Sequence, residues 1–241
     1  MSHIGIIIAM QEEAELIIER LQLVTCPNTS LRPGILFQGQ MDSLKISVLV
    51  NGWEERFQVN QIGPIPATLT AHFACTELKP DVLISAGTAG GFGSKGANIG
   101  TVYLSEKYCI FHDRLVPLPG YDLSGEGCYP VFPISTLASN LQLPQGVVST
   151  GSSLLKKDSD LQIMEKHNAV AKEMEAAAIA WVCDLYAQPF FALKSITNLL
   201  DEKEASEEQF TKNLTAATQA LTIELLRVLE YCKDRSLNSL K

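Results

Sequence analysis

The chain has 241 residues, of which 46% are hydrophobic and 19% charged, so it can bury a sizeable core and is not expected to be disordered. Its formal net charge of −8 argues against a nucleic-acid or anionic-membrane partner. Since no apolar run is long enough to span a membrane and no signal-peptide pattern or linker is visible, we expect one domain over residues 1–241, located in the cytoplasm.

The cysteines and histidines do not form a metal-binding pattern. The six cysteines include no CxxC pair, and the four histidines are not at ligand spacing from them or from one another. The sequence therefore predicts no metal, no cofactor and reduced thiols.

The first predicted element is a buried strand over residues 4–10, which is continuously apolar and rich in β-branched side chains. It stops abruptly at Gln11, and a helix with an apolar inner face follows. Glu12 and Glu13 therefore stand where a buried strand becomes a helix.

Two strands are predicted next, over residues 35–40 and 44–50. Residues 51–61 are polar and indicate no particular structure. A helix over residues 67–78 follows a proline-containing start and ends before Pro80.

A second buried strand is predicted over residues 81–86, and it ends in a glycine-rich turn over residues 87–93. The turn has neither the GxGxxG nor the P-loop spacing, so it does not indicate a dinucleotide or triphosphate site. Its glycines would still let a ligand approach the backbone closely. A tight turn without a ligand is the alternative.

The remaining chain alternates between strands and helices, with one long loop. Residues 113–129 contain two prolines and three glycines and predict an irregular loop of functional or interfacial role. The other predicted elements are strands over residues 98–105, 108–112, 147–151 and 189–197, a polar helix over 156–167 and a last helix over 206–233, whose apolar stripe, Phe210 included, we interpret as core.

Residues 172–180 (KEMEAAAIA) place a second carboxylate at a strand-to-helix joint. Glu175 would lie at the carboxyl end of a strand, where open α/β sheets bind ligands. Taken alone, a glutamate in a first helical turn is explained by the helix dipole. Glu175 repeats the placement of Glu13, however, and Asn198 with Thr197 stands at a third strand end.

These strand ends predict one crevice. Two carboxylates in a crevice can divide labour, one acting as a base and one holding a substrate hydroxyl. The side chains around them are apolar or small, which suits a flat, largely uncharged heterocycle carrying a sugar. They are Met10, Met174, Leu154, Leu155 and the glycine-rich turn.

Five segments, in the same order along the chain, resemble the 5′-methylthioadenosine/S-adenosylhomocysteine nucleosidases of the nucleoside phosphorylase/nucleosidase superfamily. They are residues 4–13 (IGIIIAMQEE), 85–92 (SAGTAGGF), 149–154 (STGSSL), 172–178 (KEMEAAA) and 194–201 (KSITNLLD). Residues 63–67 (GPIPA) and 111–127 (FHDRLVPLPGYDLSGEG) resemble the plant-type branch of the family.

The resemblance implies a three-layer α/β fold with a central twisted, mixed and mostly parallel sheet flanked by helices, working as a homodimer without a cofactor. It also implies hydrolysis of the N-glycosidic bond of 5′-methylthioadenosine, and of S-adenosylhomocysteine as a second substrate. The products are adenine and a 5-alkylthioribose.

The resemblance implies roles for individual residues. Glu13 would be the general base that deprotonates the attacking water, and Glu175 would hold the ribose hydroxyls. The substrate-binding positions would be Met10, Thr88, Ala89, Gly90, Leu154, Leu155, Glu173, Met174, Glu175 and Thr197. The loop with His112, Pro117 and Pro119 would close the 5′-alkylthio pocket of the neighbouring subunit.

Asn198 departs from the family, which has an aspartic acid there that protonates purine N7. An amide has no proton to give at neutral pH. Substrate binding would be kept, while the rate of hydrolysis would fall by the factor that general acid catalysis typically contributes, about 10²–10⁴-fold. The departure is either an engineered Asp-to-Asn change that traps a ligand or a natural feature of a weakly active relative. We favour the first, because drift would be expected to erode more than one site position.

A second departure is Ser152, where the family often has an aspartic acid. Three alternatives also stay open. The chain could be a nucleoside phosphorylase, although no arginine stands near Glu13; a non-catalytic nucleoside-binding relative; or a nucleosidase for another purine nucleoside such as futalosine.

Overall fold

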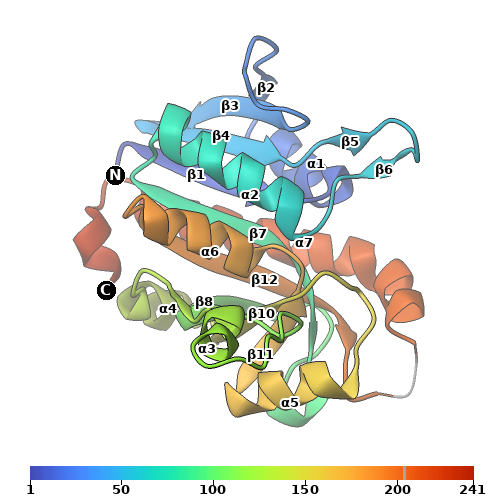
Figure 1. The fold of residues 1–241 in the computed structure, drawn as a ribbon. Coiled ribbons are helices and arrows are strands. Elements are labelled where there is room, and N and C mark those ends of the chain that lie inside the picture. The colour runs from blue at the N-terminus through green and yellow to red at the C-terminus, as the bar shows by residue number, and fades with distance from the viewer. Residues whose placement is uncertain (203–204) are drawn as a thin grey trace.

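The structure is a computed structural model that describes residues 1–202 and 205–241, and it is a three-layer α/β fold (Figure 1). Its main sheet has ten strands in the order β11-β10-β8-β12-β7-β1-β4-β3-β2, with β9 beside β8. The strands are β1 (His3–Ile8), β2 (Val24–Thr25), β3 (Ile35–Met41), β4 (Leu44–Val50), β7 (Val82–Gly91), β8 (Val102–Phe111), β9 (Tyr129–Pro130), β10 (Gln145–Thr150), β11 (Ala169–Glu173) and β12 (Phe190–Leu199).

The central strands pair in parallel. β1 lies between β4 and β7 and is parallel to both, and β12 runs parallel to β7 on its other side. β8, β10 and β11 form a second parallel run, which joins β12 through an antiparallel pairing of β8. β11 also pairs antiparallel with the end of β7, with Lys172 opposite Gly90. This pairing brings the ends of β11 and β7 together.

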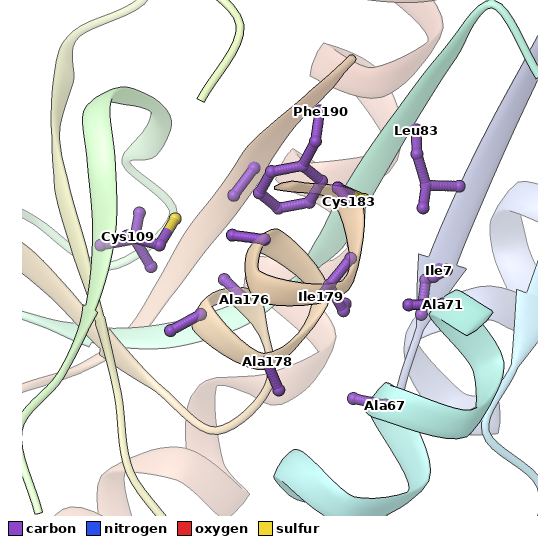
Figure 2. Close-up of a cluster of buried hydrophobic side chains, with 14 of the residues drawn as sticks. Ile7, Ala67, Ala71, Leu83, Cys109, Ala176, Ala178, Ile179, Cys183 and Phe190 are labelled. Atoms are coloured by element: carbon purple, nitrogen blue, oxygen red, sulfur yellow. The ribbon is translucent and has the colours of Figure 1, made fainter. Parts of the chain in front are cut away.

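Helices cover both faces of the sheet and build a separate core on each. On one face, α2 (Pro64–Phe73) and α6 (Ala176–Leu185) pack on Ile7 and Leu83, and Figure 2 shows the small side chains of Ala67 and Ala71 on the side of α2 that faces α6. On the other face, α1 (Gln11–Arg20), α4 (Ser135–Leu141) and α7 (Ser206–Cys232) contribute to the core that contains the alternate side chains Ile6 and Ile8. The predicted mixed sheet with flanking helices is confirmed.

The shorter elements lie at the ends of the sheet. They are the hairpin of β5 (Trp53–Glu54) and β6 (Val59–Asn60), the helices α3 (Tyr121–Glu126) and α5 (Asp158–Lys166), the π-helical turn η1 (Ala74–Leu78), and the 3-10 turns η2 (Gly93–Lys95) and η3 (Leu237–Leu240).

Three expectations about elements are corrected. The predicted glycine-rich turn is strand as far as Gly91, because glycine lets β12 approach: a β-carbon on Gly90 would lie 2.9 Å from Nδ2 of Asn198. The two strands predicted over residues 98–105 and 108–112 are one strand, β8. The long loop contains the short helix α3.

Two further observations concern the described residues. None of their helices is long and apolar enough to cross a membrane. None of their His, Cys, Asp and Glu side chains gather in a group of three or more that could hold a metal ion.

Candidate active site

A cavity of about 490 Å³ opens at the carboxyl ends of β10, β12, β7, β1 and β4, with the end of β11 beside them. Most of the predicted site residues line it. They are Met10, Glu13, Thr88, Ala89, Gly90, Leu154, Glu173, Met174, Glu175, Thr197 and Asn198. The structure thus brings together side chains from five separate segments of the chain, and the β11–β7 pairing places Glu175 in the same cavity as Glu13.

Glu13 lies in the first turn of α1 and is 4% exposed. Its Oε1 accepts two hydrogen bonds from Thr88, one from the backbone N–H at 2.7 Å and one from the hydroxyl at 2.6 Å. Burial raises the pKa of Glu13 above its usual value, and the bonds from Thr88 counteract part of that rise. Its Oε2 lies 3.3 Å from where a β-carbon on Gly87 would stand, so glycine leaves room beside the carboxylate.

Glu175 is the N-cap residue of α6. Among the described residues, one hydrogen bond reaches its carboxylate, from the N–H of Gly63 to Oε1 at 2.7 Å. Burial and the neighbouring charge of Glu173 raise the pKa of Glu175 to about 7. The carboxylate keeps free acceptor sites that face the cavity, as a group that receives substrate hydroxyls requires.

Glu173 differs from Glu175, although it also lines the cavity. Its oxygens accept the N–H groups of Glu175 at 3.0 Å and Ala176 at 2.9 Å, and the hydroxyl of Thr150. Its Oε2 is also paired with Nζ of Lys194 at 2.9 Å. The acceptors of Glu173 are therefore occupied by the protein, and the residue fixes the joint that presents Glu175.

Lys194 is the buried cation beneath the carboxylates, and its side chain is 2% exposed. Besides Glu173 it donates to the hydroxyl of Ser85 at 3.0 Å. Burial alone would lower the pKa of Lys194, but the charges of Glu173, Glu175 and Glu13 outweigh it and raise the pKa. Its place in a continuous apolar strand pattern gave no sign of this role.

Asn198 lies at the end of β12 and is 2% exposed. The hydroxyl of Thr197 donates to its Oδ1 at 3.0 Å. With its oxygen used in this way, Asn198 has the two hydrogens on Nδ2 to offer to a ligand. The side chain can hold a purine nitrogen but has no acidic proton to transfer.

Of the two predicted leucines, Leu154 lines the cavity and Leu155 does not. Leu154 lines the cavity, and Nζ of Lys172 donates to the carbonyls of Ser153 at 2.5 Å and Leu154 at 3.2 Å, which holds this loop. Leu155 is 58% exposed and is not among the described residues that line the cavity.

The structure does not bring His112, Pro117 and Pro119 together. His112 is 1% exposed and shares a hydrogen bond of 2.9 Å with the hydroxyl of Ser149, so it is buried within its own subunit. Pro117 and Pro119 are exposed on the loop after β8. Of the three, only the prolines are placed where a neighbouring subunit could meet them.

Several cavity residues were missed in the sequence. Trp53, Val59, Asn60 and Ile62 come from the hairpin and its exit, a stretch whose polar composition gave no structural signal. Phe210 of α7 also lines the cavity, which corrects its assignment to the core. Only a break in the apolar stripe of this helix could have indicated that Phe210 lines a cavity, and the stripe has no such break.

A second cavity, of about 780 Å³, adjoins the first and shares Ile62 and Met174 with it. The start of α2 and Trp181 of α6 line it. Large apolar side chains are exposed on this part of the molecule and on the loop after β8, including Ile65 at 79%, Leu118 at 57% and Leu123 at 69%. Apolar surface of this kind is typical of an interaction site.

Comparison with known proteins identifies the family. Residues 3–230 match the model of the phosphorylase superfamily. The 5′-methylthioadenosine/S-adenosylhomocysteine nucleosidase of Arabidopsis thaliana is 36% identical over 242 aligned residues, which cover 99% of this chain and 95% of that protein.

Solved structures agree. An Arabidopsis thaliana 5′-methylthioadenosine nucleosidase in its apo form superimposes with a TM-score of 0.96 at 36% identity, covering 99% of this chain and 98% of the other. A futalosine hydrolase of Helicobacter pylori, 22% identical over 95% of this chain and 98% of its own, gives a TM-score of 0.76 and shows only the shared fold. The chain therefore belongs to the phosphorylase superfamily and, within it, to the 5′-methylthioadenosine/S-adenosylhomocysteine nucleosidases.

Proposed function

We propose that the chain binds 5′-methylthioadenosine, and S-adenosylhomocysteine as a second substrate, and hydrolyses the N-glycosidic bond to adenine and a 5-alkylthioribose. The observation that carries the proposal is the meeting of Glu13, Glu175 and Asn198 in one cavity of a chain from this family. Such a reaction belongs to methionine salvage in the cytoplasm.

Glu13 is the general base for water. The bond breaks through an oxocarbenium-like state, so positive charge develops on the ribose and a buried carboxylate stabilises that state more than the ground state. Thr88 holds one oxygen of Glu13, and the other stays available to a water molecule. The same negative charge disfavours phosphate as the nucleophile, which supports hydrolysis over phosphorolysis.

Glu175 receives the ribose hydroxyls, with Met174 beside the sugar. The purine lies between the Leu154 loop and the end of β12, with N7 facing Asn198. Because an amide cannot protonate N7, the chain as it stands is a weakened enzyme that holds its substrate.

The working form is a homodimer. The second cavity shares Ile62 and Met174 with the first, and its apolar rim would be exposed in a monomer. The loop with Pro117 and Pro119 from a second copy would fill it and complete the 5′ end of the site. His112, buried in its own subunit, would support that loop from below.

Restoring an acid at position 198 tests the proposal. Adenine release from 5′-methylthioadenosine and from S-adenosylhomocysteine is measured, in separate reactions, for the parent chain and the Asn198→Asp variant. The variant is expected to gain about 10²–10⁴-fold in rate, without phosphate. Asn140→Asp, at an exposed asparagine on α4, is the matched control and is expected to gain nothing.

The alternatives predict other results. Tight nucleoside binding without turnover, even after Asn198→Asp, would support a binding protein. Product formation that requires phosphate and yields a sugar 1-phosphate would support a phosphorylase. Release of the base only from another purine nucleoside, such as futalosine, would show that the substrate is a different one while the mechanism is the same.

A further inference from the structure

The purine end of the cavity is bordered by two hydrogen-bond donors. Lys172 on β11 and Asn198 on β12 both line the cavity, and both are paired with Gly90 of β7, one on each edge of that strand. Gly90 has no side chain, and a β-carbon there would lie 2.9 Å from Nδ2 of Asn198. The backbone between the two donors is therefore open to the edge of a flat ring.

Asn198 presents its amino group to a ligand. The hydroxyl of Thr197 lies 3.0 Å from Oδ1 of Asn198 and 3.2 Å from the carbonyl oxygen of Ala89, so the amide oxygen is its closer acceptor. With Oδ1 held in this way, the hydrogens on Nδ2 remain for a ligand. Thr197 thus fixes which end of the amide a purine meets.

The acceptors at this end already have donors from the protein. Nζ of Lys172 donates to the carbonyls of Ser153 at 2.5 Å and Leu154 at 3.2 Å, which leaves a third hydrogen on Nζ. Glu173 is occupied by Lys194 and by backbone N–H groups. In the described part of the chain, the purine end therefore offers donors rather than free carboxylate oxygens.

The two common classes of purine differ at the edge that would meet these donors. A 6-oxopurine has two neighbouring acceptors, N7 and O6, whereas adenine has the acceptor N7 beside an amino group, which is a donor. The amino group of Asn198 can donate to the two acceptors of the first. In the second it would face another donor, and a donor that loses water without gaining an acceptor weakens binding.

We infer that Asn198, together with Lys172, makes the site prefer nucleosides of a 6-oxopurine to nucleosides of adenine. This inference rests on the proposed function, from which it takes the position of the purine, and it names the class of base that fits the same site best. An aspartate at position 198 would reverse the preference, because an ionised carboxylate accepts from the amino group of adenine and repels O6.

Calorimetry with 5′-methylthioadenosine and 5′-methylthioinosine, its 6-oxo counterpart, measures the preference. The Glu13→Gln background has no base to activate water, so both nucleosides stay intact. With Asn198 in place, 5′-methylthioinosine is expected to bind at least about tenfold more tightly. Adding Asn198→Asp should reverse the order, while Asn140→Asp, at an exposed asparagine, should not. Contacts to N1, which also differs between the two bases, cancel when the variants are compared.

The orientation of the amide is tested at Thr197. Thr197→Val keeps the shape of the side chain and removes the hydroxyl, so the amide of Asn198 can turn its oxygen toward adenine. The Kd ratio of 5′-methylthioadenosine to 5′-methylthioinosine should then fall about threefold or more. Thr211→Val, at an exposed threonine on α7, should leave the ratio unaltered. An unchanged ratio in Thr197→Val would overturn the orientation on which the inference depends.

The second donor is tested with a pair of lysines. Lys172→Met removes the ammonium and should lower the same ratio about threefold, whereas a loosened loop alone would weaken both nucleosides equally. Lys95 also donates to a backbone carbonyl, that of Ala169 at 2.7 Å, and is not among the described residues that line the cavity. Lys95→Met should therefore leave the ratio unaltered.

The outcomes separate the inference from the proposed function. Tighter binding of 5′-methylthioadenosine than of 5′-methylthioinosine, with Asn198 in place, overturns the inference alone. The same holds if Asn198→Asp leaves the order of the two nucleosides unchanged. If neither nucleoside binds, and the single variant Asn198→Asp cleaves neither, the proposed function itself fails.

Discussion

Glu173 and Glu175 stand two residues apart, line the same cavity and have opposite surroundings. Glu173 is surrounded by donors, from two backbone N–H groups, a threonine hydroxyl and the ammonium of Lys194. Glu175 receives one described hydrogen bond, from Gly63, and its pKa is raised to about 7 by burial and by the charge of Glu173. One carboxylate is satisfied by the protein and the other is left for a ligand.

The difference shows how the fold leaves one buried carboxylate available for a ligand. Burying a charge costs free energy unless donors compensate it, and the protein supplies most of that compensation to Glu173. Glu173 in turn holds the N–H groups at the start of α6, and so fixes Glu175 in an environment that is only partly compensated in the ligand-free protein. Among the predicted substrate-binding residues, we therefore regard Glu173 as a positioning residue.

The largest expected effect comes from breaking the satisfied pair. Glu173→Gln leaves the buried ammonium of Lys194 without its closest partner, and should lower the free energy of unfolding by about 3–5 kcal/mol in urea denaturation. Adding Lys194→Met removes the unpaired ammonium and should recover part of the loss, because Glu13 and Glu175 lose the charge of Lys194 as well. A double variant no more stable than Glu173→Gln would contradict the pairing.

Replacing Glu175 is expected to have a smaller effect on the free energy of unfolding, and one that increases stability. The folded pKa of Glu175 lies above its ordinary value of 4.5, so its contribution to stability is fully present below pH 4.5 and is lost as pH rises through about 7. Glu175→Gln removes that loss and keeps an acceptor for Gly63. Above pH 8 the ligand-free variant should be about 1–3 kcal/mol more stable than the parent, with the gap closing toward pH 4.5.

Thermal and urea unfolding of both proteins between pH 4.5 and 8.5 measures that gap. Glu202→Gln, at an exposed position beyond β12, serves as a control that should show no comparable pH dependence. A Glu175→Gln variant less stable than the parent at pH 8 would mean that Glu175 is compensated in the ligand-free protein after all.

The smallest expected effect is on binding. If Glu175 receives the ribose hydroxyls in its ionised form, as proposed, affinity for 5′-methylthioadenosine should rise with pH through about 7 and level off above it. The Kd at pH 6 should be about tenfold weaker than at pH 8, and Glu175→Gln should flatten the dependence. A dependence that persists unchanged in the variant would assign it to another group.

Much of this arrangement could be predicted from the sequence. The buried strands that end near Met10, Glu173 and Asn198 are visible in the sequence as apolar runs. Glu13 and Glu175 are noticeable because each follows the end of such a run. Glycine-rich residues 87–91 look like a turn in the sequence, because the close approach of β12 that extends them as strand depends on pairing far along the chain.

The features that could not be predicted depend on contacts between residues that are far apart in the sequence. Glu173 and Glu175 look alike in the chain, and only the contacts with Lys194 and Gly63 separate them. The hairpin over residues 53–60 has only two paired positions and a polar composition. Its sequence therefore shows neither the alternating pattern nor the hydrophobicity that distinguishes a strand from a loop. Phe210 sits on the apolar stripe of α7, and helical spacing cannot tell a core position from a cavity wall.

A crystal structure of the parent chain with bound 5′-methylthioadenosine tests the division between the two carboxylates most directly. The ribose hydroxyls are expected within hydrogen-bond distance of Glu175, with purine N7 at Nδ2 of Asn198, while Glu173 keeps Lys194 and touches no ligand atom. A sugar bound through Glu173, with Glu175 left unpartnered, would contradict the account.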